Sequence, residues 1–297
     1  MKLPEKVIIT EVGPRDGFQN IKEWIPTVLK KEIINKLIDA GFPKIEVSSF
    51  VNPQAIAQLQ DAGEIVKSVL NRSAQAIFYV LVPNFTGAKM ACELGISHVT
   101  YVFSVSQSHN MENVRRTVEA SLEELRKIRE QLPSLSVKAG LATAFDCPFE
   151  GKIPAERVVQ MVERCLDLGI EEICLSDTIG TSNPRQTEDL LAALENRFPG
   201  RRFGFHFHDT QGMGLANVLV ALQHGFFSFE SSVGGLGGCP FAPGAAGNIA
   251  SEDLINMLEG MGIKTGVSIA GVLEAAELIQ KGIKCNLTGH LVNVCNR

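Results

Sequence analysis

The feature that most constrains this chain is a regular alternation of short β-rich segments with longer segments of helical periodicity. The eight β-rich segments are residues 6–12, 44–50, 76–82, 98–105, 136–145, 171–177, 203–209 and 227–233. Parallel strands that are joined by right-handed helical crossovers close readily into a barrel when there are eight of them. The alternation therefore predicts an α/β fold, a (β/α)8 TIM barrel, with a doubly wound open sheet as the competing arrangement.

Glycine followed by an apolar residue precedes four of these strands, at Gly41, Gly95, Gly169 and Gly225. Glycine adopts the left-handed conformation that ends a helix, and the next apolar residue packs back onto that helix. We therefore expect a helix to end at each of these positions.

Apolar residues also recur every three or four positions before Pro133, which predicts one continuous helix face. They are Val114, Val118, Leu122, Leu125, Ile128 and Leu132.

No linker or low-complexity stretch divides the 297 residues, so we expect a single catalytic domain. The barrel should occupy about residues 6–250, and residues 251–297 should form additional C-terminal helices, near 251–261 and 268–282.

The composition, with 45% hydrophobic and 21% charged residues, is typical of a soluble globular protein. A formal net charge of −5 argues against nucleic acid as a partner. No apolar run has the length of a signal peptide or a membrane span, so we expect a cytoplasmic protein that does not bind a membrane. The 7 cysteines lack CxxC spacing, which predicts reduced thiols and neither a disulfide framework nor a zinc site.

The active sites of such barrels form where the strands end. Unusual polar residues occur at several of these ends, namely Arg15, Asp16, Glu46, Asp177, His206, His208, Cys239 and Asn248. We therefore expect them to meet at one rim of the barrel.

His206 and His208 are two residues apart on a strand, so both imidazoles should project from the same face. A lone HxH pattern more often holds a core histidine, but Asp16 and Asn248 are available on neighbouring strand ends. One carboxylate, two imidazoles and one amide oxygen suit Mg²⁺ or Mn²⁺, with Zn²⁺ less favoured.

Glu46 and Asp177 each have two interpretations. Either could orient a metal ligand, or Glu46 could pair with Arg15, and Asp177 could cap the following helix. A guanidinium beside a metal can donate hydrogen bonds to an enolate or carboxylate oxygen and stabilise its charge. Arg15 is therefore a candidate catalytic and substrate-binding residue.

Cys239 lies in the segment GGLGGCPFAPGAAGN, residues 234–248, which glycine and proline exclude from helix and central strand. A lone cysteine is usually inert packing, but on a loop beside a metal and Arg15 it could donate or accept a proton.

Four segments together identify a resemblance. EVGPRDGFQN (11–20), LSDTIG (175–180), HFHDT (206–210) and SSVGGLGGCPFAPGAAGNIASEDL (231–254) closely resemble the corresponding motifs of 3-hydroxy-3-methylglutaryl-CoA lyases. The resemblance covers about residues 7–265 in the same order. Claisen-condensing synthases of the wider family lack a cysteine loop of this kind.

This resemblance implies Asp16, His206, His208 and Asn248 as metal ligands, Arg15 as the essential arginine, Cys239 as the catalytic thiol, and Glu46 and Asp177 as further acidic site residues. Gln19 and Lys22 correspond to the loop that approaches the substrate and its CoA moiety. It also implies a small-molecule acyl-CoA substrate, with CoA not held as a prosthetic group, and a possible homodimer.

The implied reaction is cleavage of (S)-3-hydroxy-3-methylglutaryl-CoA to acetyl-CoA and acetoacetate. Arg15 would stabilise the enolate oxygen and Cys239 would protonate the carbon, while Asp16 and a metal-bound water remain alternative acceptors of the hydroxyl proton. A lyase for a larger 3-hydroxy-3-alkylglutaryl-CoA, an acetyl-CoA-dependent condensing synthase and an inactive CoA-sensing scaffold are the alternative functions.

Overall fold

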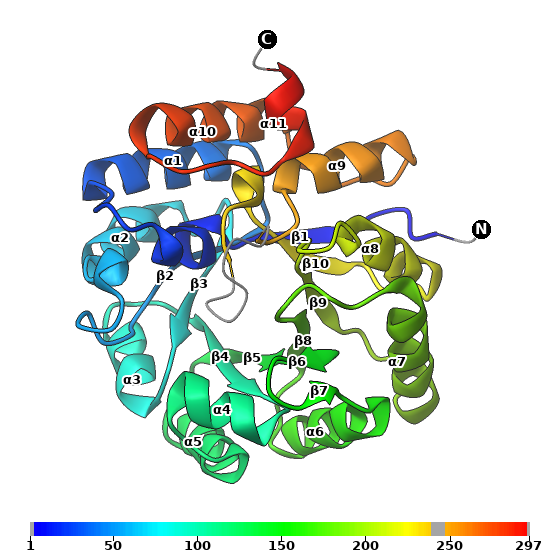
Figure 1. Cartoon of the computed structure of the whole chain (residues 1–297). Helices are drawn as coiled ribbons and strands as arrows, with labels where there is room; N and C mark the ends of the chain where they lie inside the picture. Colours follow the sequence, from blue (N-terminus) through cyan, green and yellow to red (C-terminus); the bar gives the residue numbers. More distant parts are fainter. Residues whose placement is uncertain (1–2, 239–246, 296–297) are drawn as a thin grey trace.

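The eight predicted strands form a closed parallel barrel in the computed structural model, which describes residues 3–238 and 247–295 (Figure 1). Around the barrel the strands follow the order β1, β10, β9, β8, β5, β4, β3, β2. They are β1 (Ile8–Glu11), β2 (Lys44–Ser49), β3 (Ile77–Val82), β4 (His98–Ser104), β5 (Ser136–Ala142), β8 (Glu172–Asp177), β9 (Gly204–Phe207) and β10 (Ser228–Ser231). The barrel is confirmed, and the open sheet is excluded because β1 pairs with both β2 and β10.

Helices surround the barrel and cover its outer face (Figure 1). They are α1 (Thr27–Asp39), α2 (Ala62–Val69), α3 (Phe85–Glu93), α4 (Gln107–Val114), α5 (Val118–Gln131), α6 (Ala155–Asp167), α7 (Pro184–Arg197) and α8 (Gly214–Gln223). The apolar faces of the helices and the outward side chains of the strands form one core. None of the helices in the described part of the chain is long and apolar enough to cross a membrane.

The four predicted glycine caps are confirmed, with φ between 74° and 95° at Gly41, Gly95, Gly169 and Gly225. After three of them the next amide donates back to the preceding helix, as from Ile96 to the Ala91 carbonyl over 3.0 Å. These bonds satisfy carbonyls at the helix end and direct the chain into the following strand.

The predicted continuous helix from Val114 to Leu132 is wrong, because the chain breaks between α4 and α5. Arg115 adopts a left-handed conformation with φ 55°, and Thr117 caps the new helix. The Asn110 side chain donates 2.9 Å bonds to the Arg116 carbonyl and to Ser121 Oγ. The Asn110 side chain thus supplies the hydrogen bond to the Arg116 carbonyl that a continuous helix would have supplied from its own backbone.

Two kinds of short element, a hairpin and several helical turns, lie outside the predicted pattern of one helix per strand. The strands β6 (Asp146–Cys147) and β7 (Gly151–Lys152) form a small antiparallel hairpin after β5. The short helical turns are η1 (Gly13–Gly17), η2 (Phe18–Asn20), η3 (Ala57–Leu59), η4 (Leu70–Arg72) and η5 (Val233–Gly235).

The C-terminal segment adds three helices, α9 (Ser251–Gly260), α10 (Ile269–Gly282) and α11 (His290–Cys295). The first two were expected, and α10 packs along α1 and against α9 beside the β1 side of the barrel (Figure 1). The segment before α11 also reaches the barrel mouth, because Thr288 N donates to the Gly234 carbonyl over 2.9 Å.

Candidate active site and metal centre

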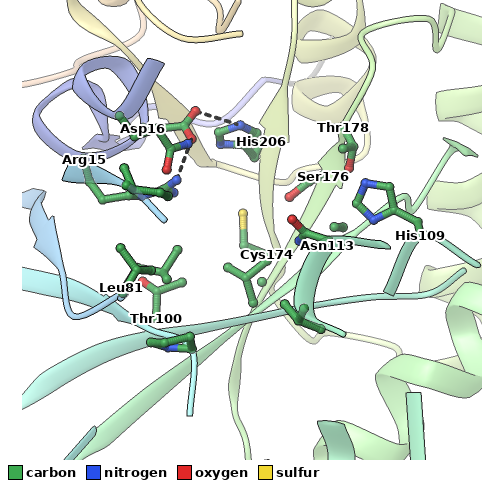
Figure 2. A pocket seen from close by; sticks show the side chains of 18 of the residues that line it. Arg15, Asp16, Leu81, Thr100, His109, Asn113, Cys174, Ser176, Thr178 and His206 are labelled. Carbon is green, nitrogen blue, oxygen red and sulfur yellow. Dashed lines mark hydrogen bonds and ion pairs between the residues drawn. The ribbon is translucent and has the colours of Figure 1, made fainter. Parts of the chain in front are cut away.

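A cavity of about 670 Å³ opens at the carboxyl ends of the barrel strands. Figure 2 shows Asp16 between Arg15 and His206 on one side of it, with Asn113 and His109 on the other. Small and apolar side chains of the barrel strands, such as Val102 on β4 and Ala142 on β5, also line it. The position is the one where catalytic residues of such barrels collect.

The turn η1 carries Arg15 and Asp16 from the end of β1 into this cavity. The amides of both residues donate to the Val12 carbonyl, over 3.1 Å and 2.7 Å. Glycine is required on either side of them, because a Cβ would lie 2.7 Å from Glu11 Oε1 at Gly13 and 2.7 Å from Leu236 Cβ at Gly17. The PRDG sequence therefore forms a turn that packs closely against the loop after β10.

Arg15 is held between two carboxylates. Its Nε donates to Glu46 Oε2 on β2, and its Nη1 donates to Asp16 Oδ1 over 2.5 Å. Burial favours the neutral form, but Glu46 and Asp16 outweigh it, so the pKa of Arg15 is raised. The Glu46 pair with Arg15, one of the two sequence interpretations, is present and orients the guanidinium that lines the cavity.

Asp16 is the centre of the hydrogen-bond network. Its Oδ1 also accepts from Gln19 Nε2 over 2.8 Å, and its Oδ2 accepts from Asn248 Nδ2 over 2.7 Å. Burial alone would raise the pKa of Asp16, yet Arg15 and the two nearby histidines lower it. The group is therefore an ionised carboxylate.

His206 and His208 project from the same face at the end of β9, as the sequence predicts. Their Nε2 atoms lie 3.0 Å apart, and Asp16 Oδ2 lies 4.0 Å from Nε2 of His206. On the opposite face the rings of Phe205 and Phe207 stack in the core at 5.7 Å. Burial and the neighbouring His206 lower the pKa of His208 to about 3, which keeps its imidazole neutral, as a metal ligand must be.

The residues present fit a divalent ion. One potential ligand atom from each of Asp16, His206 and His208 lies within 4.8 Å of the others. Adjacent ligands of an octahedral ion with bonds of about 2.1 Å lie about 3.0 Å apart, which matches the imidazole spacing. Asn248 uses its Nδ2 for Asp16 and the Leu236 carbonyl, and its buried Oδ1 has no partner among the described residues. That amide oxygen is available as a fourth ligand.

Gln19 lines the cavity, whereas Glu46 and Asn248 lie behind residues that line it, bonded to Arg15 and Asp16. Asp177 and Lys22 neither line the cavity nor contact these residues among the bonds described. The Asp177 carboxylate accepts from Gly180 N, Ser182 N and Ser182 Oγ, the last over 2.7 Å. It therefore holds the loop between β8 and α7, whose N-cap is Asn183 rather than Asp177. Lys22 is exposed after η2 and is not among the described residues that line the cavity.

Cys239 lies outside the described residues. Gly238 lines the cavity, and Gly237, with φ 130°, is so close to the site that a Cβ there would lie 2.4 Å from Asn248 Nδ2. The described part of the chain thus ends at Gly238 beside the candidate metal ligands and resumes at Gly247, next to Asn248.

Buried charges within the strands were missed by the sequence analysis. Lys138 on β5 and Glu230 on β10 line the cavity, and Glu230 Oε2 lies 2.9 Å from Nδ1 of His206. A charged residue in an apolar strand is costly to bury unless it is paired, and this signal could have identified both.

Glu11, at the end of β1, links the two loops that build the site. Its Oε1 accepts from Gly13 N over 2.7 Å and from Val233 N over 3.0 Å, and its Oε2 accepts from Ser251 Oγ over 2.6 Å. Glu252 similarly accepts from Gly234 N over 3.0 Å. Burial raises the pKa of both carboxyl groups to about 7.

These raised pKa values predict a pH dependence of stability. Protonation favours the folded state, so the contribution of Glu11 and Glu252 is complete below their unfolded pKa and is lost as pH rises through about 7. From about pH 5.5 to pH 8, the unfolding free energy of the natural protein should fall by about 2–4 kcal/mol more than that of the variant E11Q/E252Q. Urea unfolding at both pH values measures this, with E277Q on exposed α10 as control, and parallel pH dependences would contradict it.

The fold and this site define a class of protein, a (β/α)8-barrel enzyme with a candidate divalent-metal centre at the carboxyl ends of its strands. The sequence model described as HMGL-like matches residues 6–279, and the chain belongs to that family, whose members include hydroxymethylglutaryl-CoA lyases.

Curated relatives support the same assignment. The chain is 44% identical over 283 residues to a hydroxymethylglutaryl-CoA lyase of Bacillus subtilis, covering 95% of this chain and 94% of that protein. It is 41% identical over 280 residues to the mitochondrial hydroxymethylglutaryl-CoA lyase of Mus musculus, covering 93% and 86%. The chain is therefore a lyase of this family.

Solved structures agree with the fold over its whole length. An HMG-CoA lyase of Bacillus subtilis superimposes with a TM-score of 0.96 at 42% identity, covering 100% of both chains. An HMG-CoA lyase of Acinetobacter baumannii in complex with coenzyme A and 3-methylmalate gives 0.92 at 39% identity, covering 99% and 96%.

Proposed function

We propose that this protein cleaves (S)-3-hydroxy-3-methylglutaryl-CoA to acetyl-CoA and acetoacetate with the aid of bound Mg²⁺ or Mn²⁺. The observation that carries the proposal is the convergence of Asp16, His206 and His208 beside Arg15 in one cavity, with Asn248 bonded to Asp16. The names of the relatives support the substrate, and the Acinetobacter baumannii lyase binds both CoA and a small hydroxy dicarboxylate.

Asp16, His206, His208 and Asn248 would hold the ion. When bound, a divalent ion supplies Lewis acidity that makes the tertiary hydroxyl of the substrate easier to deprotonate. The donor set has no thiolate and includes oxygen and nitrogen ligands, which favours Mg²⁺ or Mn²⁺ over softer ions.

Arg15 would stabilise the charge that develops during carbon–carbon bond cleavage. The electrons of the broken bond pass to the acetyl-CoA fragment as an enolate, and the former tertiary alcohol becomes the ketone of acetoacetate. Glu46 and Asp16 fix the Arg15 guanidinium in advance, so donating to the enolate oxygen requires little reorganisation.

Cys239 would then protonate the enolate carbon. Gly238, which precedes Cys239 in the sequence, lines the cavity and supports this role. Asp16 is a poor acceptor for the hydroxyl proton, since its pKa is lowered and both of its oxygens already accept hydrogen bonds. This favours a water molecule as the acceptor.

Gln19 would contact the substrate from the cavity wall, whereas Lys22 could reach only the CoA moiety outside it. Asp177 would act indirectly, through the loop that it holds. We further propose that the protein acts on its small-molecule acyl-CoA in the cytoplasm, and that it forms a homodimer.

The decisive experiment is to assay acetoacetate formation from (S)-3-hydroxy-3-methylglutaryl-CoA by protein that has been freed of metal with a chelator. We expect kcat to fall at least about 100-fold and to recover with Mg²⁺ or Mn²⁺, since Lewis acidity contributes several kcal/mol. If no divalent ion gives product, the same protein should be tested with a larger 3-alkyl substrate, and a positive result there would replace the proposed substrate.

A further inference from the structure

Three buried polar side chains are bonded in a row, from Lys138 through Glu230 to the candidate metal ligand His206. Lys138 on β5 donates from Nζ to Glu230 Oε1, and Glu230 Oε2 lies 2.9 Å from Nδ1 of His206. The side chains of Lys138 and Glu230 are only 4% and 11% exposed, and both line the cavity. The row therefore ends at a candidate metal ligand.

The strand register brings Glu230 to His206. The two residues are directly paired across β10 and β9, so their side chains leave neighbouring strands on the same side, into the barrel. Lys138 comes from β5, beyond β8 in the strand order, and reaches Glu230 through the barrel interior. Its Nζ lies 4.9 Å from the centre of the Tyr79 ring, a further contact that holds it there.

This bonding determines which nitrogen of His206 is available. A carboxylate only accepts hydrogen bonds, so Glu230 requires the proton of His206 on Nδ1. In the neutral imidazole, the form that can bind a metal, the lone pair is then on Nε2, the atom that faces His208 and Asp16. Both oxygens of Glu230 are engaged, one by Lys138 and one by His206, which fixes the carboxylate and the imidazole ring together.

We propose that Glu230 is a positioning residue that sets the tautomer and orientation of His206 for metal binding, and that Lys138 holds Glu230 in place. This inference rests on the metal site of the proposed function. A carboxylate that accepts from the outer nitrogen of a ligand histidine commonly raises metal affinity 10–100-fold.

A buried ion pair elsewhere in the chain provides a matched control. Lys30 Nζ lies 3.0 Å from Asp61 Oδ1, with side chains 3% and 8% exposed, and neither residue lines the cavity. If Lys138 and Glu230 served only to stabilise the barrel, removing either pair should change the stability of the protein and leave its Mn²⁺ affinity unchanged.

The test compares Mn²⁺ dissociation constants of metal-free proteins by isothermal titration calorimetry. Removing both charges, in K138M/E230L, avoids leaving one buried charge without its partner. We expect about 10–100-fold weaker Mn²⁺ binding for K138M/E230L and unchanged binding for K30M/D61L. Unchanged affinity in K138M/E230L would overturn the inference, whereas a natural protein that does not bind Mn²⁺ would instead refute the metal site.

Histidine NMR of the unmodified protein gives a second test, which needs no folded variant. Nitrogen-15 shifts of the metal-free protein should place the His206 proton on Nδ1. A proton on Nε2 with Nδ1 unprotonated in the unmodified protein would contradict the role of Glu230.

Discussion

Asp16→Asn should abolish metal binding and lower kcat by about 1,000-fold or more, because the variant loses the only carboxylate in the proposed ligand set. Asn has nearly the same shape, so the turn η1 should persist. The loss of activity would have a second cause. In the natural protein Arg15 Nη1 donates to Asp16 Oδ1, and the neutral amide of the variant would hold the guanidinium less firmly.

Mn²⁺ titration and the acetoacetate assay should be measured on the same preparation of D16N. D61N, in the buried ion pair outside the cavity, is the matched control for changing an aspartate to asparagine. If D16N binds Mn²⁺ as tightly as the natural protein, Asp16 is not a ligand and the metal site must be reassigned.

Cys239→Ser should lower kcat by about 100- to 10,000-fold while leaving Mn²⁺ affinity unchanged, because the thiol is proposed to transfer a proton and not to bind the ion. A serine hydroxyl has a much higher pKa than a thiol, so it is a poor proton donor to carbon at neutral pH. C239S thus tests the proton transfer with little change in side-chain size.

Exchange of the acetyl-CoA methyl protons with deuterated water isolates this step. A residue that protonates the enolate must also remove a proton from acetyl-CoA in the reverse direction, so C239S should lose the exchange together with the cleavage. Cys92→Ser, on α3 outside the cavity, is the control for loss of a thiol. Retention of both exchange and turnover by C239S would remove the cysteine from the mechanism.

Much of the barrel could be predicted because its signals are local. Strand periodicity and the glycine caps are encoded by neighbouring residues, and all eight barrel strands lie within the predicted segments. The helix break at Arg115 could not be predicted from apolar spacing, which continues across it. It depends on the Asn110 side chain, whose bonds to Arg116 and Ser121 form only when the chain turns there.

Within the candidate site, the sequence predicted correctly that His206 and His208 share a face, since alternation along a strand is independent of tertiary context. The same alternation turns Asp177 away from the cavity, because Cys174 and Ser176 of β8 line it. Whether a residue at a strand end faces inward depends on how the strand is placed in the closed barrel.

The sequence by itself determined the order of strands and helices, the helix ends and the residue types available for metal chemistry, because these follow from periodicity and from side-chain chemistry. Only the tertiary structure decided that Asp16 bonds to Asn248 and that Arg15 lies between Asp16 and Glu46. It also decided that Lys138 bonds to Glu230, which in turn bonds to His206. The physical reason is barrel closure: pairing of β1 with β10 brings the two ends of the sheet together, and charges from distant strands then share one interior where burial requires each to find a partner.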